Sequence, residues 1–494
     1  MSVPALLFLA IAVPLAHAIL VARLSRPPGL RDVVHVGGAL MLALVCAFLL
    51  ARVGQGWSGR AVFAEPLPGL QLAFAAEPLG VAFAAVAASL GVLCALYSVG
   101  WMRLKKDPAP ARFMAFSALA LASTVGVALA TNLFTFFVFY EGLSIATFPL
   151  LAHRGNKQSG RAAAFYLVLM LALAMGALLP AIIWTSVVVG SLDFNVAGLL
   201  AGRVTPFAAN ILLVLYVLGI GMAALFPAHR WITAASGASA PASALVFAVT
   251  AASVGGFGVL RIAAYVFGPA LRDAYIAAEG VLILAIVTLL GASLAAFGRR
   301  NLSERLSYLC VAQLSAITAG AMLGPALNTQ LAAGWYAAAL QLFAYGMATA
   351  TLCFAIGAIE AASGRADIDD LGGLGRKMPW VFASLALGAL SFAGAPPLAG
   401  AFPKLWLMIA AADHGALWAG FAIAAGALLS FAALTAPVVR ALFASTTAEQ
   451  EVTPDGAPLL ILVPTVAAGA STLLLLLWLN PIAIFLTGLR GGAP

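Results

Sequence analysis

The sequence contains few charged residues, since Asp, Glu, Lys and Arg make up only 9% of its 494 positions while hydrophobic residues make up 64%. Soluble globular domains average about 25% charged residues, so this composition excludes a soluble protein and leaves no sizeable aqueous domain. A mean hydropathy of +1.07 instead predicts an all-α, polytopic membrane protein. The net charge of +8 is then interpreted by its distribution between the two sides of a membrane, and we expect no nucleic acid partner.

Cysteine and histidine are scarce as well. The four cysteines, Cys46, Cys94, Cys310 and Cys353, lie singly in four different apolar runs, without a Cys-x-x-Cys pair or a histidine at ligand spacing. Iron–sulfur clusters and structural zinc sites need such ligand clusters. We therefore expect the chain to bind no metal and no redox cofactor. No catalytic site is predicted in it, and whether it belongs to an enzyme complex stays open.

The N-terminal apolar run lacks the pattern of a cleavable signal peptide. This run, 3–22, is followed rather than preceded by its positive charges Arg23, Arg26 and Arg31, the reverse of the signal-peptide order. We interpret it as a retained first helix with its N-terminus outside.

Long apolar runs are what the chain has in quantity. About 20 apolar residues cross the hydrocarbon core, which predicts about fourteen membrane helices and a multi-pass location in the cell (inner) membrane. Most of the 25 Lys and Arg gather in alternate loops, which by the positive-inside rule places both termini outside. The predicted spans are 3–22, 33–53, 77–101, 112–130, 132–152, 161–188, 206–231, 240–267, 274–297, 305–323, 330–360, 378–411, 415–443 and 457–487.

Two of these spans are interrupted by glycine and proline, the seventh at Gly221–Pro227 and the twelfth at Gly394–Pro403. Proline removes a backbone donor and clashes with the preceding turn, so both helices must break. An offset of five spans inverts the direction of crossing, which predicts two inverted five-helix repeats with broken helices 7 and 12. The predicted divisions are N-terminal helices 1–3 in 1–111, a first repeat in 112–267, an inverted second repeat in 274–443, and helix 14 in 457–494.

Two charges fall inside the predicted spans near features that suggest a site. Lys404 follows the second break, and Glu141 lies near the middle of the fifth span. A charge at this depth costs about 2.5–3.5 kcal/mol on insertion scales, so it needs a partner, water or a neutral form. Both are candidates for a proton pathway, and His229 at the cytoplasmic edge is a candidate for proton uptake. The structural alternatives are a lysine that reaches the membrane surface and a protonated glutamate bonded to a neighbouring helix.

Several motifs give the chain a family resemblance. They are Phe139-Tyr140-Glu141, Pro227-Ala-His229-Arg-Trp231, Ser243-Ala-Leu, the segment 301–313, Asp370-Leu-Gly-Gly, and Gly394-Ala-Pro-Pro-Leu-Ala-Gly400 with Lys404. From about residue 70 to 440 the sequence resembles the antiporter-like membrane subunits shared by respiratory complex I, membrane-bound hydrogenases and Mrp-type cation/proton antiporters. The resemblance is closest to the D-type subunits of Mrp antiporters. It implies a fourteen-helix fold with inverted repeats and a line of ionisable residues that carries protons along the membrane midplane.

The chain departs from the family pattern at the centre of that line. Met222, Phe247, Ser253, Tyr345 and Thr349 stand where the resemblance leads one to expect lysine or histidine. Of the usual line only Glu141 and Lys404 remain. A continuous proton pathway would then need bound waters, helped by the polar side chains of Ser253, Gln341, Tyr345 and Thr349.

Three functions are consistent with these features. The first is a subunit of a multi-subunit monovalent cation/proton antiporter of Mrp type, with Glu141 as proton acceptor and Lys404 as the switchable positive charge. The second is a proton-translocating subunit of a complex I-like NADH:quinone oxidoreductase or a membrane hydrogenase. The third is a degenerate structural subunit of such a complex. All three imply other membrane subunits, the lipid bilayer, and protons or monovalent cations such as sodium as partners.

Overall fold

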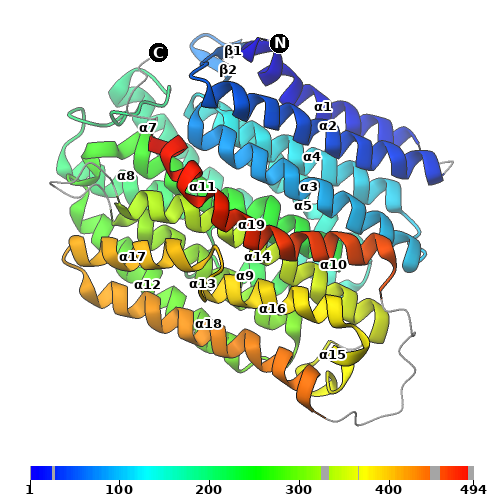
Figure 1. Cartoon of the computed structure of the whole chain (residues 1–494). Coiled ribbons are helices and arrows are strands. Elements are labelled where there is room, and N and C mark those ends of the chain that lie inside the picture. The colour runs from blue at the N-terminus through cyan, green and yellow to red at the C-terminus, as the bar shows by residue number, and fades with distance from the viewer. Residues whose placement is uncertain (1, 25–27, 324–332, 365, 445–456, 488–494) are drawn as a thin grey trace.

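The computed structural model describes residues 2–24, 28–323, 333–364, 366–444 and 457–487. The first residues of the predicted span 330–360 and the end of the predicted segment 457–494 lie outside the described residues. Figure 1 shows long helices lying side by side, with the start of the chain next to a small β-hairpin at one end of the bundle. The mostly helical architecture confirms the predicted fold class.

The N-terminal part consists of five long helices. Helix α4 packs against α1, α3 and α5, and α2 packs between α1 and α3. Their bounds are α1 Val3–Arg23, α2 Pro28–Gly54, α3 Pro78–Leu104, α4 Pro110–Leu129 and α5 Leu133–Leu151.

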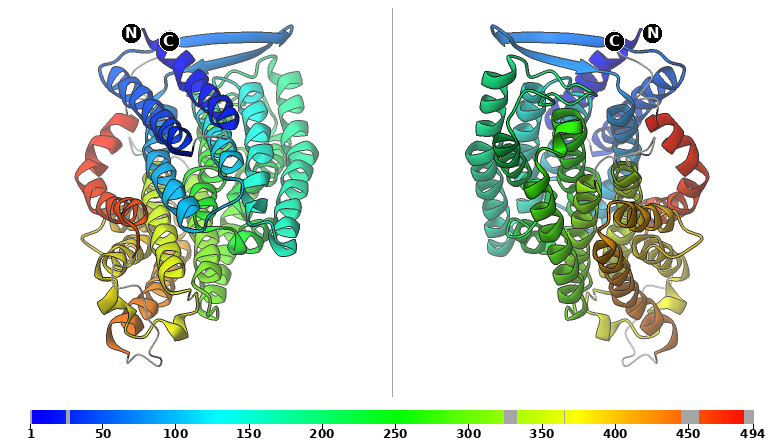
Figure 2. Two further views of the ribbon diagram at one scale, coloured as in Figure 1. Left: turned by 90° about the vertical axis from the view of Figure 1, so that its right-hand side faces the viewer. Right: turned by 90° about the vertical axis from the view of Figure 1, so that its left-hand side faces the viewer.

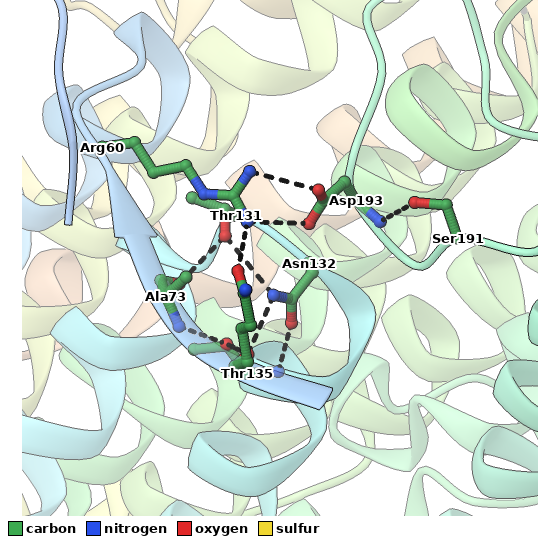
Figure 3. A network of polar contacts seen from close by, with 8 residues as sticks. Arg60, Ala73, Thr131, Asn132, Thr135, Ser191 and Asp193 are labelled. Atoms are coloured by element: carbon green, nitrogen blue, oxygen red, sulfur yellow. Dashed lines mark hydrogen bonds and ion pairs between the residues drawn. The ribbon is translucent and has the colours of Figure 1, made fainter. Parts of the chain in front are cut away.

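A two-stranded antiparallel hairpin, β1 Arg60–Leu67 and β2 Leu70–Ala75, stands between α2 and α3. The all-α prediction missed it because the hairpin lies between the apolar spans and β1 is almost wholly exposed, so hydropathy carries no signal there. Figure 3 shows how β2 is bonded to the start of α5: the Asn132 amide and the Thr135 hydroxyl both donate to the Gln71 carbonyl, at 2.9 and 3.0 Å. The Thr135 hydroxyl also accepts from the Ala73 N–H at 3.0 Å. The hairpin therefore fixes the first turn of the helix that carries Glu141.

The same network reaches the loop that contains Asp193. Arg60 of β1 pairs with Asp193 at 3.1 Å, and an isolated β-bridge joins Asp193 to Asn132 (Figure 3). This loop follows one long crossing made of α6 Lys157–Leu173, a π-helical turn η2 Ala174–Leu178 and α7 Leu179–Val189.

The predicted break of the seventh span is confirmed. Helix α8 Pro206–Gly219 ends in a 3₁₀ turn, η3 Gly221–Ala223, and helical structure resumes only at α9 Arg230–Ala234. Ala224, which closes the 3₁₀ turn, has a φ of 55°, in the left-handed region. The short 3₁₀ turn η4 Ala235–Gly237 then leads into the next crossing.

The eighth span is the most irregular crossing. It runs through α10 Ala240–Ser243, a π-helical segment η5 Ala244–Val249, α11 Ala251–Arg261, a second π-helical segment η6 Ile262–Phe267 and the 3₁₀ turn η7 Gly268–Leu271. π-Helical turns are rare and gather at functional sites, because they leave backbone carbonyls without the usual helical donor. This crossing and Gly334–Ser363 of α14 are the two most deeply buried of the candidate membrane spans in the described part of the chain. They form the centre of the bundle.

The second half of the chain repeats the pattern of long helices and one break. Helix α12 packs against α13 and α18, and α14 packs against α13, α16 and α17. Short turns η1 Ala152–Arg154, η8 Ile368–Asp370 and α15 Leu374–Lys377 lie between crossings. The helices are α12 Tyr275–Phe297, α13 Leu302–Met322, α14 Ala333–Ser363, α16 Pro379–Ala393, α17 Ala401–Asp413 and α18 Leu417–Phe443.

The break of the twelfth span is also confirmed and is narrower than predicted. Helix α16 ends at Ala393 and α17 begins at Ala401, so Pro403, predicted as the last residue of the break, lies inside the first turn of α17, directly before Lys404. A proline is tolerated there because the first turn of a helix does not use its N–H groups.

The last helix, α19 Leu459–Thr487, crosses the outside of the bundle and packs against α3, α14 and α16. Figure 2 shows it in red at the outer edge. Eleven helices of the described part are long and apolar enough to cross a membrane, and two shorter apolar helices, Pro206–Gly219 and Pro379–Ala393, begin the broken spans. The chain is therefore a multi-pass membrane protein, while the number of fourteen crossings stays a prediction.

Candidate functional site

Glu141 lies in the middle of α5 and is 8% exposed. The helix starts at Asn132, whose side-chain oxygen accepts the Thr135 N–H at 2.7 Å and so caps the first turn. Neither carboxylate oxygen of Glu141 has a hydrogen-bond partner among the described residues. An isolated buried carboxylate is unstable in its charged form, so Glu141 either holds a proton or requires water or a partner.

The surroundings of Glu141 contain further buried polar atoms. The hydroxyls of Tyr166 on α6 and Thr147 on α5 are buried near each other, and neither makes a well-aligned hydrogen bond within the described part of the chain. Tyr166 is close enough to Glu141 to interact with it electrostatically. Buried polar groups are normally satisfied by protein or ordered water, so this cluster is suited to hold water next to Glu141.

Tyr140 connects α5 to the broken seventh helix. Its hydroxyl accepts the backbone N–H of Met222 at 3.1 Å, which satisfies one of the backbone groups freed by the break. The Met222 side chain is fully buried. Met222 therefore lies beside the turn of α5 that carries Glu141.

Lys404 lies in the first turn of α17 and is 4% exposed. Its ammonium group donates to the carbonyl of Phe392, in the last turn of α16. The last four carbonyls of a helix lack helical donors and carry the negative end of the helix dipole, so this is a favourable place for a cation. The helix break thus provides the acceptor that holds Lys404 inside the bundle. Lys404 does not extend to the membrane surface, so that structural alternative is excluded.

Two glycines of the break are required by geometry. Gly394 has a φ of 85°, and a Cβ there would lie 2.7 Å from Cδ of Lys404. A Cβ on Gly400 would lie 1.9 Å from the carbonyl oxygen of Ser391. The two ends of the break therefore approach each other more closely than any residue with a side chain allows.

Replacing Gly400 by alanine is expected to destabilise the assembled protein by about 1–3 kcal/mol, the usual cost of overpacking, because the Ser391 backbone would have to move. Gly291→Ala in α12 is the matched control, since nothing lies within 4 Å of the Cβ it would add. Thermal unfolding of the purified complex measures the difference. Equal transition temperatures for Gly400→Ala and Gly291→Ala would contradict the packing argument.

Lys404 also lines a small internal cavity together with Gln313 of α13, Ser293 of α12 and Ser430 of α18. The Ser293 hydroxyl lacks a hydrogen-bond partner among the described residues. Gln341 of α14 donates to the side-chain oxygen of Gln313 at 2.8 Å. Gln341 is thereby connected to the cavity of Lys404 through Gln313.

Three further residues of the predicted pathway lie deeper in the centre. The Tyr345 hydroxyl donates to the Phe247 carbonyl at 2.8 Å, and the Ser253 hydroxyl donates to the Ala248 carbonyl at 2.7 Å. Both acceptors belong to the π-helical segment η5. The Thr349 hydroxyl, one helical turn beyond Tyr345 on α14, is fully buried without a partner in the described residues. Tyr345 and Ser253 thus meet at the irregular backbone of the eighth span.

Aromatic side chains separate the two charged ends. The ring centroids of Tyr166 and Trp231 lie 5.2 Å apart, and those of Trp231 and Phe247 lie 6.3 Å apart. The ring centroids of Tyr345 and Phe392 lie 6.4 Å apart, and the Phe392 backbone carbonyl accepts the hydrogen bond from Lys404. A row of residues joined by ring contacts and by hydrogen bonds to backbone carbonyls therefore runs from the Glu141 region to Lys404, and within it Phe247 and Tyr345 are aromatic where the family resemblance implies lysine or histidine.

His229 is placed apart from this row. It immediately precedes α9, is only partly buried, and its ring stacks on Phe226 at 5.7 Å. Phe226 is more than half exposed toward the outside of the bundle. The structure therefore does not bring His229 together with the other predicted pathway residues.

A third charge buried in the bundle, Arg261 of α11, has partners. It is 1% exposed, pairs with Glu77 at 2.6 Å, donates to the Ala130 carbonyl at 2.7 Å, and lies over the ring of Tyr265 at 4.5 Å. A buried charge with such partners serves packing and orientation. The contrast with the unpartnered carboxylate of Glu141 separates a structural charge from a candidate site.

Sequence reasoning missed three residues of the site. Gln313 ends the segment that carried the family resemblance, Tyr140 directly precedes Glu141, and Tyr166 lies on α6. Each could have been suspected only as a polar residue within an apolar run. Their importance follows from neighbours on other helices. No group of three or more His, Cys, Asp or Glu side chains that could hold a metal ion occurs among the described residues.

Comparison with known proteins agrees with this geometry. Residues 130–430 match the family described as NADH:quinone oxidoreductase/Mrp antiporter, TM. NADH-quinone oxidoreductase subunit L of Mycobacterium tuberculosis is 30% identical over 451 residues, which cover 88% of this chain and 67% of that protein. The Na(+)/H(+) antiporter subunit A1 of Staphylococcus aureus is 25% identical over 420 residues, which cover 81% of this chain but only 50% of that protein.

Two solved structures have the same fold. A chain of the Mrp complex from Dietzia sp. DQ12-45-1b superposes with a TM-score of 0.85 at 22% identity, covering 99% of this chain and 97% of that one. A chain of the membrane-bound sulfane sulfur reductase, an archaeal respiratory membrane complex, superposes with a TM-score of 0.82 at 21% identity, covering 98% of both chains. The matched family, the fold and the two broken helices lead to one assignment: the chain belongs to the antiporter-like membrane subunits of the NADH:quinone oxidoreductase/Mrp antiporter family.

Proposed function

We propose that the chain is a membrane subunit of a multi-subunit monovalent cation/proton antiporter of Mrp type and contributes to proton translocation, with the D-type subunits of Mrp antiporters as its nearest counterparts. The observation that carries the proposal is a pair of buried charges in helices of the two halves. Glu141 has no hydrogen-bond partner among the described residues, and Lys404 is held by the end of a broken helix. Glu141 is suited to accept and release a proton, and Lys404 is suited to switch between charged and neutral forms.

The proposed pathway uses polar side chains and water between these ends. From the cavity of Lys404 the pathway would continue through Gln313 and Gln341. It would then pass Tyr345, Thr349 and Ser253 toward the seventh helix. The division into two inverted five-helix repeats, 112–267 and 274–443, is part of the proposal, and it is supported by one broken helix in each half. His229 stays a candidate for proton uptake at one end of the bundle.

The second candidate is a proton-translocating subunit of a redox complex, which the match to the Mycobacterium tuberculosis subunit favours. The third, a structural subunit, is favoured by the aromatic residues Phe247 and Tyr345 in the middle of the row, at positions where the family resemblance implies lysine or histidine. These candidates differ in what drives proton movement.

Reconstituting the whole native complex into vesicles with a pH-sensitive dye distinguishes the candidates. For an Mrp-type antiporter, we expect an imposed gradient of sodium or another monovalent cation to move protons without an electron donor. Proton movement that requires a quinone or hydrogen reaction would replace this proposal with the redox candidate. Movement that persists unchanged when both Glu141 and Lys404 are replaced would favour the structural candidate.

A further inference from the structure

Two buried histidines lie outside the proposed pathway, in the N-terminal helices. His17 of α1 is 3% exposed and His35 of α2 is 2% exposed, and Nε2 of His17 lies 3.1 Å from Nδ1 of His35. Nε2 of His35 lies 3.3 Å from the hydroxyl of Ser98 on α3. A Cβ on Gly38 would lie 2.5 Å from the His17 ring, so glycine on α2 leaves the space that this ring occupies. The arrangement is built by three different helices.

The hydrogen bonds fix which ring atoms carry hydrogen. The Ser98 hydroxyl donates its single hydrogen to the Ala95 carbonyl at 2.8 Å, so it must accept from Nε2–H of His35. A neutral His35 then has a bare Nδ1, which accepts from Nε2–H of His17. Nδ1 of His17 is therefore the ring nitrogen at which the pair can take another proton without losing a hydrogen bond.

A proton taken up there can move along the pair. When Nδ1 of His17 gains a proton, the hydrogen on Nε2 of His17 can pass to Nδ1 of His35, which leaves His17 neutral and makes His35 the imidazolium. Nε2–H of His35 still donates to Ser98 after this transfer. In total one proton enters, two N–H bonds form, at Nδ1 of His17 and at Nδ1 of His35, and one breaks, at Nε2 of His17, so all the hydrogen bonds are kept.

The groups packed around the pair differ between its two sides. Toward one end of the bundle lie Arg31 and Asp32 on α2 and Arg103 on α3, with the Asp32 carboxylate bonded to both arginines at 3.0 and 2.8 Å. On the other side lies a small cavity lined by His35, Ser98, Cys94 of α3 and Ser117 of α4. The crossing that contains α10 and η5 contributes Pro241 and Leu245 to this cavity and no charged group.

We propose that His17, His35 and Ser98 form a second proton-binding site, whose ligand is one additional proton shared by the two rings and through which pH acts on the pathway. Leu245, which lines the cavity beside His35, belongs to the same π-helical segment as Phe247, the acceptor of Tyr345. A positive charge gained at the pair therefore lies across this small cavity from the segment that bonds Tyr345, in a region of low dielectric. The link to transport rests on the proposed function, whereas proton binding by the pair does not.

The first test uses the unaltered complex with ¹⁵N-labelled histidine in this chain. Solid-state NMR identifies the pair by magnetisation transfer between the two nitrogens across the N–H···N hydrogen bond. As the pH is lowered from about 8 to about 4, which extends below the range in which an exposed histidine changes charge, we expect the pair to gain one proton and keep this bond. Two rings that stay neutral throughout, or a pair that separates on acidification, would overturn the proposal.

The second test compares proton flux against pH in vesicles for His17→Gln, His35→Gln and the double variant. We expect the pH midpoint of flux to shift by about one unit, the size typical of perturbed groups, and by the same amount in all three because the rings act together. His414→Gln is the control, since His414 pairs with Glu279 at a distant site. Profiles that superimpose on that of the unaltered complex would disprove the link to transport. An unaltered complex without flux would refute the proposed function instead, and the NMR titration would still decide proton binding.

Discussion

Replacing Lys404 by alanine is expected to lower proton flux through the assembled complex by about 100-fold. Positioned groups that transfer or stabilise a proton commonly contribute about 10²–10⁴-fold to a rate. The substitution removes the cation held by the end of α16 and leaves the Phe392 carbonyl without its donor. Lys404→Met is the companion variant, because it keeps most of the side-chain volume in the cavity shared with Gln313.

The measurement is dye-reported proton movement in vesicles that contain the whole complex, with the amount of this chain determined in the same membranes. Lys157→Ala is the matched control, since Lys157 is exposed at the start of α6. Both Lys404 variants should be present at normal levels and inactive. Flux within about twofold of the unaltered complex in both would refute a transport role for Lys404 and support the structural candidate.

Glu141→Gln is expected to reduce flux as severely as Glu141→Ala. Glutamine fits the same space and can form hydrogen bonds, but it cannot release a proton. If Glu141 acted only as a protonated side chain bonded to a neighbouring helix, glutamine would substitute for it. The same flux assay decides between the two roles, with Glu65→Gln on the exposed hairpin as the control. Activity retained in Glu141→Gln and lost in Glu141→Ala would identify the structural role.

The position of Met222 allows a complementary experiment on the same carboxylate. The Tyr140 hydroxyl accepts from the Met222 backbone, and Glu141 is the next residue of α5, so we expect a lysine introduced by Met222→Lys to reach an acidic partner. Val168→Lys, at a position of α6 that is 68% exposed on the outside of the bundle, has none and should cost about 2.5–3.5 kcal/mol. We expect Met222→Lys to accumulate in membranes at a higher level than Val168→Lys. The reverse order would show that Glu141 does not accommodate a cation from the seventh helix.

Much of the fold was predictable because the relevant forces are local in sequence. Apolar runs of membrane-crossing length specify helices, and the prolines and glycines of Gly394–Pro403 forbid a continuous one. The break itself was confirmed, but its end was placed too far along the chain, because a proline in a first helical turn has the same sequence appearance as one in a break. The β1–β2 hairpin and the π-helical segment η5 were not predicted, since neither has a hydropathy pattern of its own.

The sequence by itself determined that this is a multi-pass membrane protein of the antiporter-like family, with two broken helices and two rare charges, Glu141 in the fifth span and Lys404 just after the second break. Composition, run length and helix-breaking residues act over a few turns of chain, so they can be evaluated without knowing the neighbours. Only the tertiary structure decided that Lys404 is held by the Phe392 carbonyl, that Glu141 has no partner among the described residues while Arg261 has several, and that His17 and His35 share a hydrogen bond. Groups on other helices decide whether a buried charge is paired, and those contacts exist only after the bundle has packed.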